Sequence, residues 1–325
     1  MRKRFQNIFL YTILIGTSLL LLPILTFSQR ILIQTGKLKF EAGIALGPSF
    51  FLGDLGGNAG KGSSFIKDIN LQFTNIMDGA YLVVYPADWI GFRLGAQVGK
   101  LQGDDSAVST KGTFEVLRKQ RNLDFKTNIT EAYFAIEVFP LMLLSTFQRS
   151  QPKLRPYAVA GVGIFHFNPQ GSLKDTSGHQ VWYYLHPLRL EGQGMKEYPD
   201  RKEYKLTQIN IPVGLGFKYF ISERFNISGE FLFRKTFTDY VDDVSSKYID
   251  PIYFDRYLSP ADAALAKRLA NKSLNMAPPD TQRGNSKNND SYFNLFLKVG
   301  VHLGRIYSTE SEKNNAHQSH CPSLY

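Results

Sequence analysis

The chain has 325 residues, of which 14% are aromatic and 20% charged, and its formal net charge is +10. Its basic residues are spread along the chain without the dense stripe or recognisable module of a nucleic-acid-binding protein, so no nucleic-acid partner is expected. The single cysteine, Cys321, excludes an internal disulfide framework and a paired-cysteine metal site.

The N-terminus is basic and then apolar. Arg2, Lys3 and Arg4 precede a nearly uninterrupted apolar run, Ile8–Leu25, and Ser28 supplies a small residue at a suitable cleavage position. This order is typical of a cleaved secretory signal peptide, so residues 1–28 are predicted to be removed. The alternative is a retained membrane helix, since the run is about long enough to span a bilayer.

Eight later segments are predicted as strands because most of them alternate apolar with polar or small residues. They are Leu38–Leu46, Asp78–Tyr85, Ile90–Lys100, Thr130–Phe139, Arg155–Phe167, Gln208–Phe220, Arg224–Phe233 and Ser291–Leu303. Long connections follow the first, third, fifth and seventh segments, and shorter ones follow the second, fourth and sixth. An even number of strands with long loops on one side is typical of a closed outer-membrane barrel.

The predicted fold is therefore an all-β, eight-stranded antiparallel transmembrane barrel over residues 29–304, with a periplasmic tail over residues 305–325. Short turns and both termini would face the periplasm, long loops would face outside, and lipids of the outer membrane would surround the barrel. A soluble β-sandwich is the alternative, although a sandwich has no reason to separate its loop lengths so strictly.

The polar faces of the strands carry a balanced set of charges. Four are carboxylates and four are cations: Glu41, Glu131, Glu137 and Glu230, with Arg93, Lys218, Arg234 and Lys298. An eight-stranded barrel is just wide enough for side chains to fill it, and an unpaired buried ion costs several kcal/mol. These side chains are predicted to pair as a plug of salt bridges. The glutamates could instead be paired catalytic acids, but no substrate cleft is evident, so neither an enzyme nor a cofactor is expected.

Three other segments carry weaker signals. The acidic residues Asp239, Asp242, Asp243 and Asp250 lack the spacing of an EF-hand loop and are predicted to be a solvated strand extension rather than a cation site. Residues 259–270 predict a helix, capped by Ser259 with Pro260 in its first turn. This helix is expected to pack over the barrel mouth rather than bind a partner. His317, His320 and Cys321 are expected to lie in a disordered tail rather than to bind a metal.

The chain also resembles the DUF6089-type outer-membrane barrels, which include the PorG-like subunit of the type IX secretion machinery. The most specific likeness is the stretch Phe233–Ser245, with Thr238, Asp239, Tyr240, Asp242 and Asp243 at its centre; Glu41–Leu55, the Ala263–Ser273 helix and Arg283-Gly284-Asn285 fit the same pattern. The resemblance implies an integral component of a secretion and gliding apparatus that contacts its periplasmic ring. The alternative is a surface-exposed binding protein that uses its long outer loops.

Overall fold

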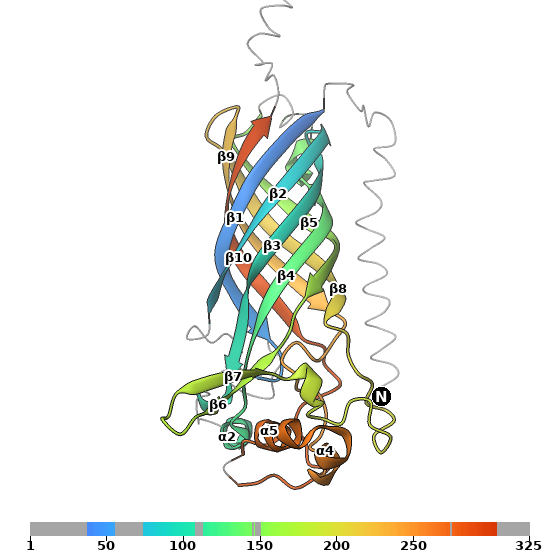
Figure 1. Cartoon of the computed structure of the whole chain (residues 1–325). Helices are drawn as coiled ribbons and strands as arrows, with labels where there is room; N and C mark the ends of the chain where they lie inside the picture. The colour runs from blue at the N-terminus through green and yellow to red at the C-terminus, as the bar shows by residue number, and fades with distance from the viewer. Residues whose placement is uncertain are drawn as a thin grey trace, which may run out of the picture. The chain divides into compact units, whose positions relative to one another are not determined.

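Eight antiparallel strands close into a barrel (Figure 1). The computed structural model describes residues 38–55, 74–107, 113–144, 146, 151–273 and 275–303. The barrel strands are β1 (Lys39–Leu52), β2 (Asn75–Ala87), β3 (Ile90–Asp104), β4 (Asp124–Val138), β5 (Leu154–His166), β8 (Thr207–Phe220), β9 (Phe225–Thr236) and β10 (Ser291–Leu303). The predicted signal peptide, the C-terminal tail and Cys321 lie outside the described residues.

The ring closes where the two ends of the barrel sequence meet. Pairing between β1 and β10 runs from Phe40 opposite Leu303 to Leu52 opposite Ser291. Every other barrel strand pairs with its neighbours in the chain, and β3 pairs with β4 along its full length, from Ile90 opposite Val138 to Asp104 opposite Asp124. The predicted eight-stranded antiparallel barrel is confirmed, and the sandwich alternative is wrong.

Most strands extend further toward the long loops than predicted, and the largest extensions are in β1 and β4. β1 continues to Leu52, and β4 begins at Asp124 rather than at Thr130. In the added part of β4 the outward side chains are Lys126 and Asn128, which are polar. The strand projects here beyond the apolar belt, so the apolar alternation used to predict it is lost.

An apolar belt covers the outside of the barrel. Its exposed side chains include Ile44, Leu46, Leu82, Leu94, Val98, Phe134, Val162, Ile164, Val213, Leu215, Leu295 and Leu297. On β8 they run from Ile209 to Tyr219, which spans roughly 25 Å at the usual strand tilt. Aromatic side chains ring the end that carries the short turns: Phe40, Phe92, Phe217, Tyr219 and Phe225. A closed sheet with an apolar belt and an aromatic girdle is suited to a lipid bilayer and not to water.

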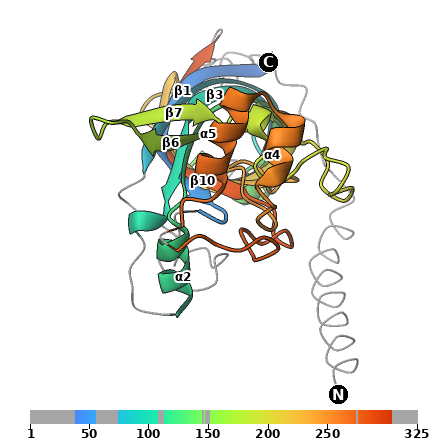
Figure 2. The ribbon, with the colours of Figure 1, turned by 60° about the horizontal axis from the view of Figure 1, so that its bottom comes forward.

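The four long loops all lie at the other end of the barrel, and we call their described residues the cap. The cap contains the hairpin β6 (Gln170–Lys174) and β7 (Gln180–Tyr184), and the helices α2 (Thr113–Arg121), α4 (Ile252–Tyr257) and α5 (Pro260–Ala270). It also contains the 3₁₀ helices η2 (Asp105–Ala107) and η4 (His186–Leu188). A third 3₁₀ helix, η3 (Pro140–Leu143), lies at the opposite end of the barrel, in the connection between β4 and β5. Figure 2 shows α4 and α5 lying across the end of the barrel.

The predicted helix is α5, and it packs as expected. The Ser259 hydroxyl accepts a hydrogen bond from the Asp262 amide at 3.2 Å, which satisfies one free donor of the first turn. Ala263, Ala266 and Leu269 are buried in a core within the cap that also holds Leu188, Leu190 and Phe254. The apolar face of α5 is thus used inside the molecule. In the described parts of the chain, no helix has the length and apolar character needed to cross a membrane.

Candidate functional site

The half of the lumen nearest the short turns is filled by an ion-pair layer around Glu230. Arg93 donates to both carboxylate oxygens of Glu230, at 2.9 and 2.6 Å. Lys298 Nζ lies 3.0 Å from the same carboxylate, and the Tyr157 hydroxyl donates to it at 2.6 Å. The forked guanidinium matches the carboxylate in two parallel bonds, which are among the strongest hydrogen bonds in proteins.

Glu137 and Glu41 continue the layer across the lumen. Arg93 Nε donates to Glu137 at 2.6 Å, and Lys218 donates to both oxygens of Glu41 at 2.9 Å. The Tyr85 hydroxyl joins these two carboxylates, 3.1 Å from Glu137 and 3.2 Å from Glu41. Three carboxylates therefore meet three cations, and none of the six is more than 4% exposed.

A second polar layer lies closer to the cap. Arg234 Nε lies 3.3 Å from a Glu131 oxygen, and the guanidinium donates to Asn294 at 2.6 Å and to Gln97 at 2.7 Å. The Asn210 amide donates to Glu131 at 2.8 Å. The structure thus places all eight predicted charges inside the barrel and within ion-pair distance of an opposite charge. The same strand alternation turns the Gln97, Asn210 and Asn294 amides inward, but it did not identify the Tyr85 and Tyr157 hydroxyls that join the first layer.

Apolar side chains close the lumen at the short turns. Phe139 and Met142, the latter on η3, are 2% and 0% exposed. The Phe139 ring packs against Tyr157 at 5.4 Å between centroids and lies beneath the Lys218 ammonium, 5.6 Å away. The lumen therefore ends in an aromatic floor rather than in an opening lined by polar groups.

Two arginines, Arg283 buried and Arg121 mostly buried, tie the four long loops together. Arg121, from the third-to-fourth-strand loop, donates to Asp105 in a fork and to the carbonyl oxygens of Asp54 and Arg283. Arg283, from the last loop, donates to Glu191 at 2.8 Å and to the Asp243 carbonyl oxygen at 2.6 Å. Each guanidinium satisfies acceptors from different loops, so the cap is one connected structure.

Glu191 is the acceptor at the centre of this network. Its carboxylate accepts hydrogen bonds from the backbone amides of Ser245 and Ser246, at 3.0 and 2.8 Å, in addition to Arg283. The sequence pattern did not single out Glu191, because a lone glutamate in an irregular loop carries no periodic signal. Gly284, in contrast, belongs to Arg283-Gly284-Asn285, one of the stretches that carry the family resemblance. A Cβ there would lie 2.6 Å from both an Asp54 oxygen and the Ser245 nitrogen.

The acidic segment is buried, which corrects the prediction of a solvated strand extension. Asp239, Asp242 and Asp243 are 7%, 0% and 0% exposed, whereas Asp250 is exposed as predicted. The chain turns inward after β9 instead of continuing the strand, and Asp243 adopts a left-handed backbone conformation, with φ of 61°. Thr238 and Tyr240 belong to the same segment, and the Tyr240 ring stacks on Tyr204 at 4.7 Å.

Burial raises the pKa of several cap carboxyls. It raises the pKa of Asp239 to about 9, with Asp54 and Asp242 adding repulsion, and that of Asp243 to about 7 against the opposing effect of Arg283. The pKa values of Asp242 and Asp290 are also raised, first by burial and then by neighbouring carboxylates. Within the described residues, no group of three Asp, Glu, His or Cys side chains is arranged to hold a metal ion.

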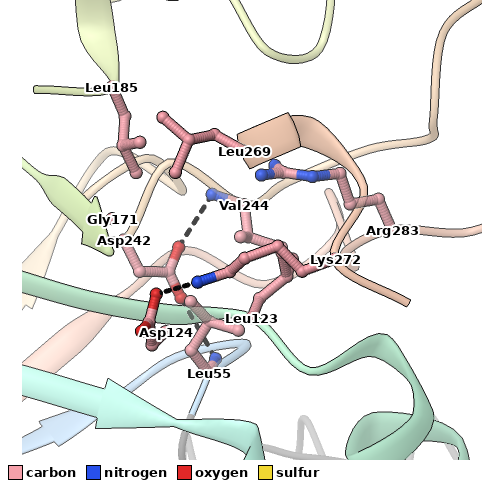
Figure 3. Close-up of a pocket in the computed structure, with 10 residues that line it drawn as sticks. All are labelled: Leu55, Leu123, Asp124, Gly171, Leu185, Asp242, Val244, Leu269, Lys272 and Arg283. Atoms are coloured by element: carbon pink, nitrogen blue, oxygen red, sulfur yellow. Dashed lines mark hydrogen bonds and ion pairs between the residues drawn. The ribbon is translucent and has the colours of Figure 1, made fainter. Parts of the chain in front are cut away.

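A cavity of about 10 Å³ lies where the loops meet (Figure 3). Asp242 borders it and accepts hydrogen bonds from the Leu55 and Val244 amides, while Lys272 forms an ion pair with Asp124 on the facing side. This space is close to the size of a single water molecule. It is too small for an organic substrate.

Comparisons with known proteins add little to this geometry. No protein-family model matches the sequence, and no curated protein sequence matches it. Similar solved structures include Ail, the attachment invasion locus protein of Yersinia pestis, bound to the heparin analogue sucrose octasulfate (6% identity, 82% of this chain and 99% of that chain, TM-score 0.32). A major outer membrane protein from Thermus thermophilus (10% identity, 82% and 100%, TM-score 0.36) is another. A third is the outer membrane protein OprG from Pseudomonas aeruginosa (12% identity, 83% and 99%, TM-score 0.34). At these identities and TM-scores the likenesses do not bear on function, and the fold rests on the strand pairing of this chain.

Proposed function

We propose that the protein is an integral outer-membrane barrel that serves as a structural and assembly component of a type IX secretion and gliding apparatus. The filled lumen is the observation that argues against an open channel. Two layers of paired charges and an aromatic floor occupy the space that a solute would cross. The protein would then act through the loops and turns at the two ends of the barrel.

Exposed leucines at the end of the barrel that carries the short turns support contact with a periplasmic ring. Leu143 and Leu144 follow the buried Met142 and are 52% and 47% exposed, beyond the aromatic girdle. Exposed leucines outside the lipid-facing belt are suited to a protein partner. The secretion apparatus itself is proposed from the family resemblance of Thr238–Val244. This segment is mostly buried within the cap, so we assign it a role in the fold rather than in contact with a partner.

Site-specific photo-crosslinking in native membranes tests this proposal. A photoreactive residue at Leu143 is expected to capture a periplasmic component of the secretion apparatus, whereas one at the exposed Asp200, in the cap, is the matched control. Capture of extracellular components at Asp200 together with no product at Leu143 would contradict the anchor function. Conductance across a planar bilayer is a separate check, and a steady open channel would contradict the plugged barrel.

A second candidate function is surface binding through the cap. It is favoured by the cap's own core, in which Leu188, Phe254 and Leu269 are nearly fully buried, and by the two arginines that join its loops. An ordered surface of this kind is pre-organised for recognition. In the crosslinking experiment this function predicts products at Asp200 and none at Leu143.

A further inference from the structure

Four carboxyl groups meet where the cap joins the barrel. Asp54 follows β1, Asp239 and Asp242 follow β9, and Asp290 precedes β10. Two of them bond amides of a different loop: the Asn285 amide donates to Asp54 at 2.5 Å and the Leu55 amide to Asp242 at 3.1 Å. These four residues form what we call the carboxyl cluster, and they hold the first and last long loops together.

Three carboxyl oxygens of the carboxyl cluster accept no hydrogen bond from the described residues. Neither side-chain oxygen of Asp239, 7% exposed, accepts a hydrogen bond of normal geometry from any described residue, and the same holds for Oδ1 of Asp290, 1% exposed. The Ser245 side chain is near enough to lower the pKa of Asp239 but does not complete such a bond. The charged neighbours that act on both aspartates are carboxylates. Buried polar atoms of this kind are normally satisfied, so the missing donors require an explanation.

The cations near the carboxyl cluster are already engaged. Arg121 faces Asp54 and Asp242 but forms its fork with Asp105. Arg283 is bound to Glu191, and Lys272 to Asp124. Negative charge in the carboxyl cluster therefore exceeds the positive charge available to balance it. Neighbouring buried carboxylates cannot all ionise, and a proton held by one of them supplies the donor that another lacks.

We propose that the carboxyl cluster is a proton-operated latch, in which bound protons hold the cap on the barrel mouth up to neutral pH and their loss in alkaline medium releases it. This device is independent of the proposed secretion role. It concerns the junction where the Leu55 amide donates to Asp242 and the Asp54 carboxylate repels Asp239, so release would separate the last long loop from the first.

The direction of the pH dependence follows from linkage. The buried Asp239 has a pKa of about 9, whereas an aspartate exposed by opening has a pKa of roughly 4. Between these values the closed cap binds more protons than the open one, so closure weakens as pH rises, by up to about tenfold per pH unit for each proton released. Below about pH 4 both forms are protonated and the dependence ends.

Hydrogen exchange followed by mass spectrometry on the full-length protein in lipid vesicles tests the latch. After correction for intrinsic exchange, opening of residues 238–246 is expected to increase at least tenfold between about pH 6 and about pH 9, while the strands stay protected. The variant Asp239→Asn is expected to lose most of this increase. The matched control, Asp200→Asn, removes an exposed cap carboxylate and should behave as the unaltered protein does.

Three results would overturn the latch. One is a corrected opening rate that does not change with pH; another is a slope that persists unchanged in Asp239→Asn. The third is loss of the slope on adding calcium chloride, with recovery on chelation, which would make the carboxyl cluster a cation site instead. If Asp239→Asn fails to fold, infrared difference spectra of the unaltered protein decide: a protonated carboxyl band must disappear over the same pH range.

Discussion

Replacing Arg93 with glutamine removes the central cation of the lumen layer. Arg93 is fully buried and makes three charge-assisted bonds, one to Glu137 at 2.6 Å and two to Glu230 at 2.9 and 2.6 Å. Without it, three carboxylates face two ammonium groups: Lys298 stays 3.0 Å from Glu230, and Lys218 lies 3.6 Å from Glu137. Breaking a buried pair from one side typically costs about 3–5 kcal/mol. Because both lysines remain, we expect a loss near the lower end of that range, about 3 kcal/mol.

The measurement is equilibrium unfolding in urea of the protein in lipid vesicles, followed by the gel shift between folded and unfolded barrels. Arg224→Gln is the matched control, since Arg224 is an exposed cation in a short turn and should change the free energy of unfolding by less than about 0.5 kcal/mol. Adding Glu230→Gln to Arg93→Gln restores charge balance, so the double variant should lose less than the two single losses added together. A loss for Arg93→Gln equal to that of the control, or strict additivity in the double variant, would refute the ion-pair plug.

Three further predictions concern the cap. Gly284→Ala places a methyl group 2.6 Å from an Asp54 oxygen and should destabilise cap closure by about 1–3 kcal/mol without unfolding the barrel; limited trypsin digestion should then cleave the cap first, and an unchanged cleavage pattern would contradict the close approach. Ser259→Ala removes the hydroxyl that caps α5 and should weaken that helix by about 1 kcal/mol, seen as faster hydrogen exchange in its first turn; equal exchange in both proteins would count against the cap. Asp243 has a pKa raised to about 7, so its contribution to cap stability is present below about pH 4 and is lost as pH rises toward 7. Asp243→Asn should flatten that part of the pH profile, and a profile that stays the same would disprove the assignment.

The barrel itself could be predicted from the sequence because it depends on a local, periodic signal. In a closed sheet every second side chain faces lipid, so the alternation in β8 and β10 fixed both the strands and the direction of each side chain. The same periodicity identified Arg93, Glu137 and Glu230 as inward-facing. It could not specify which carboxylate meets which cation, since that depends on barrel register and on the tilt that brings β3 opposite β9.

The cap was beyond the reach of periodicity. The hairpin of β6 and β7 and the short helices α2 and α4 lie within loops predicted as irregular, and they are stabilised by packing on each other rather than by local pattern. The acidic segment shows the limit most clearly. Asp239 and Asp242 were predicted to lie in a solvated strand extension, and they are buried because the loop after β1 and the later part of their own loop pack against them.

The sequence by itself therefore determined the class of fold and the inward set of charges, because both follow from which neighbours a side chain has along one strand. Only the tertiary structure decided the pairing of those charges, the joining of four loops by Arg121 and Arg283, and the burial of the carboxyl cluster. Each of these contacts joins residues far apart in the chain, and closing the barrel is what brings them together.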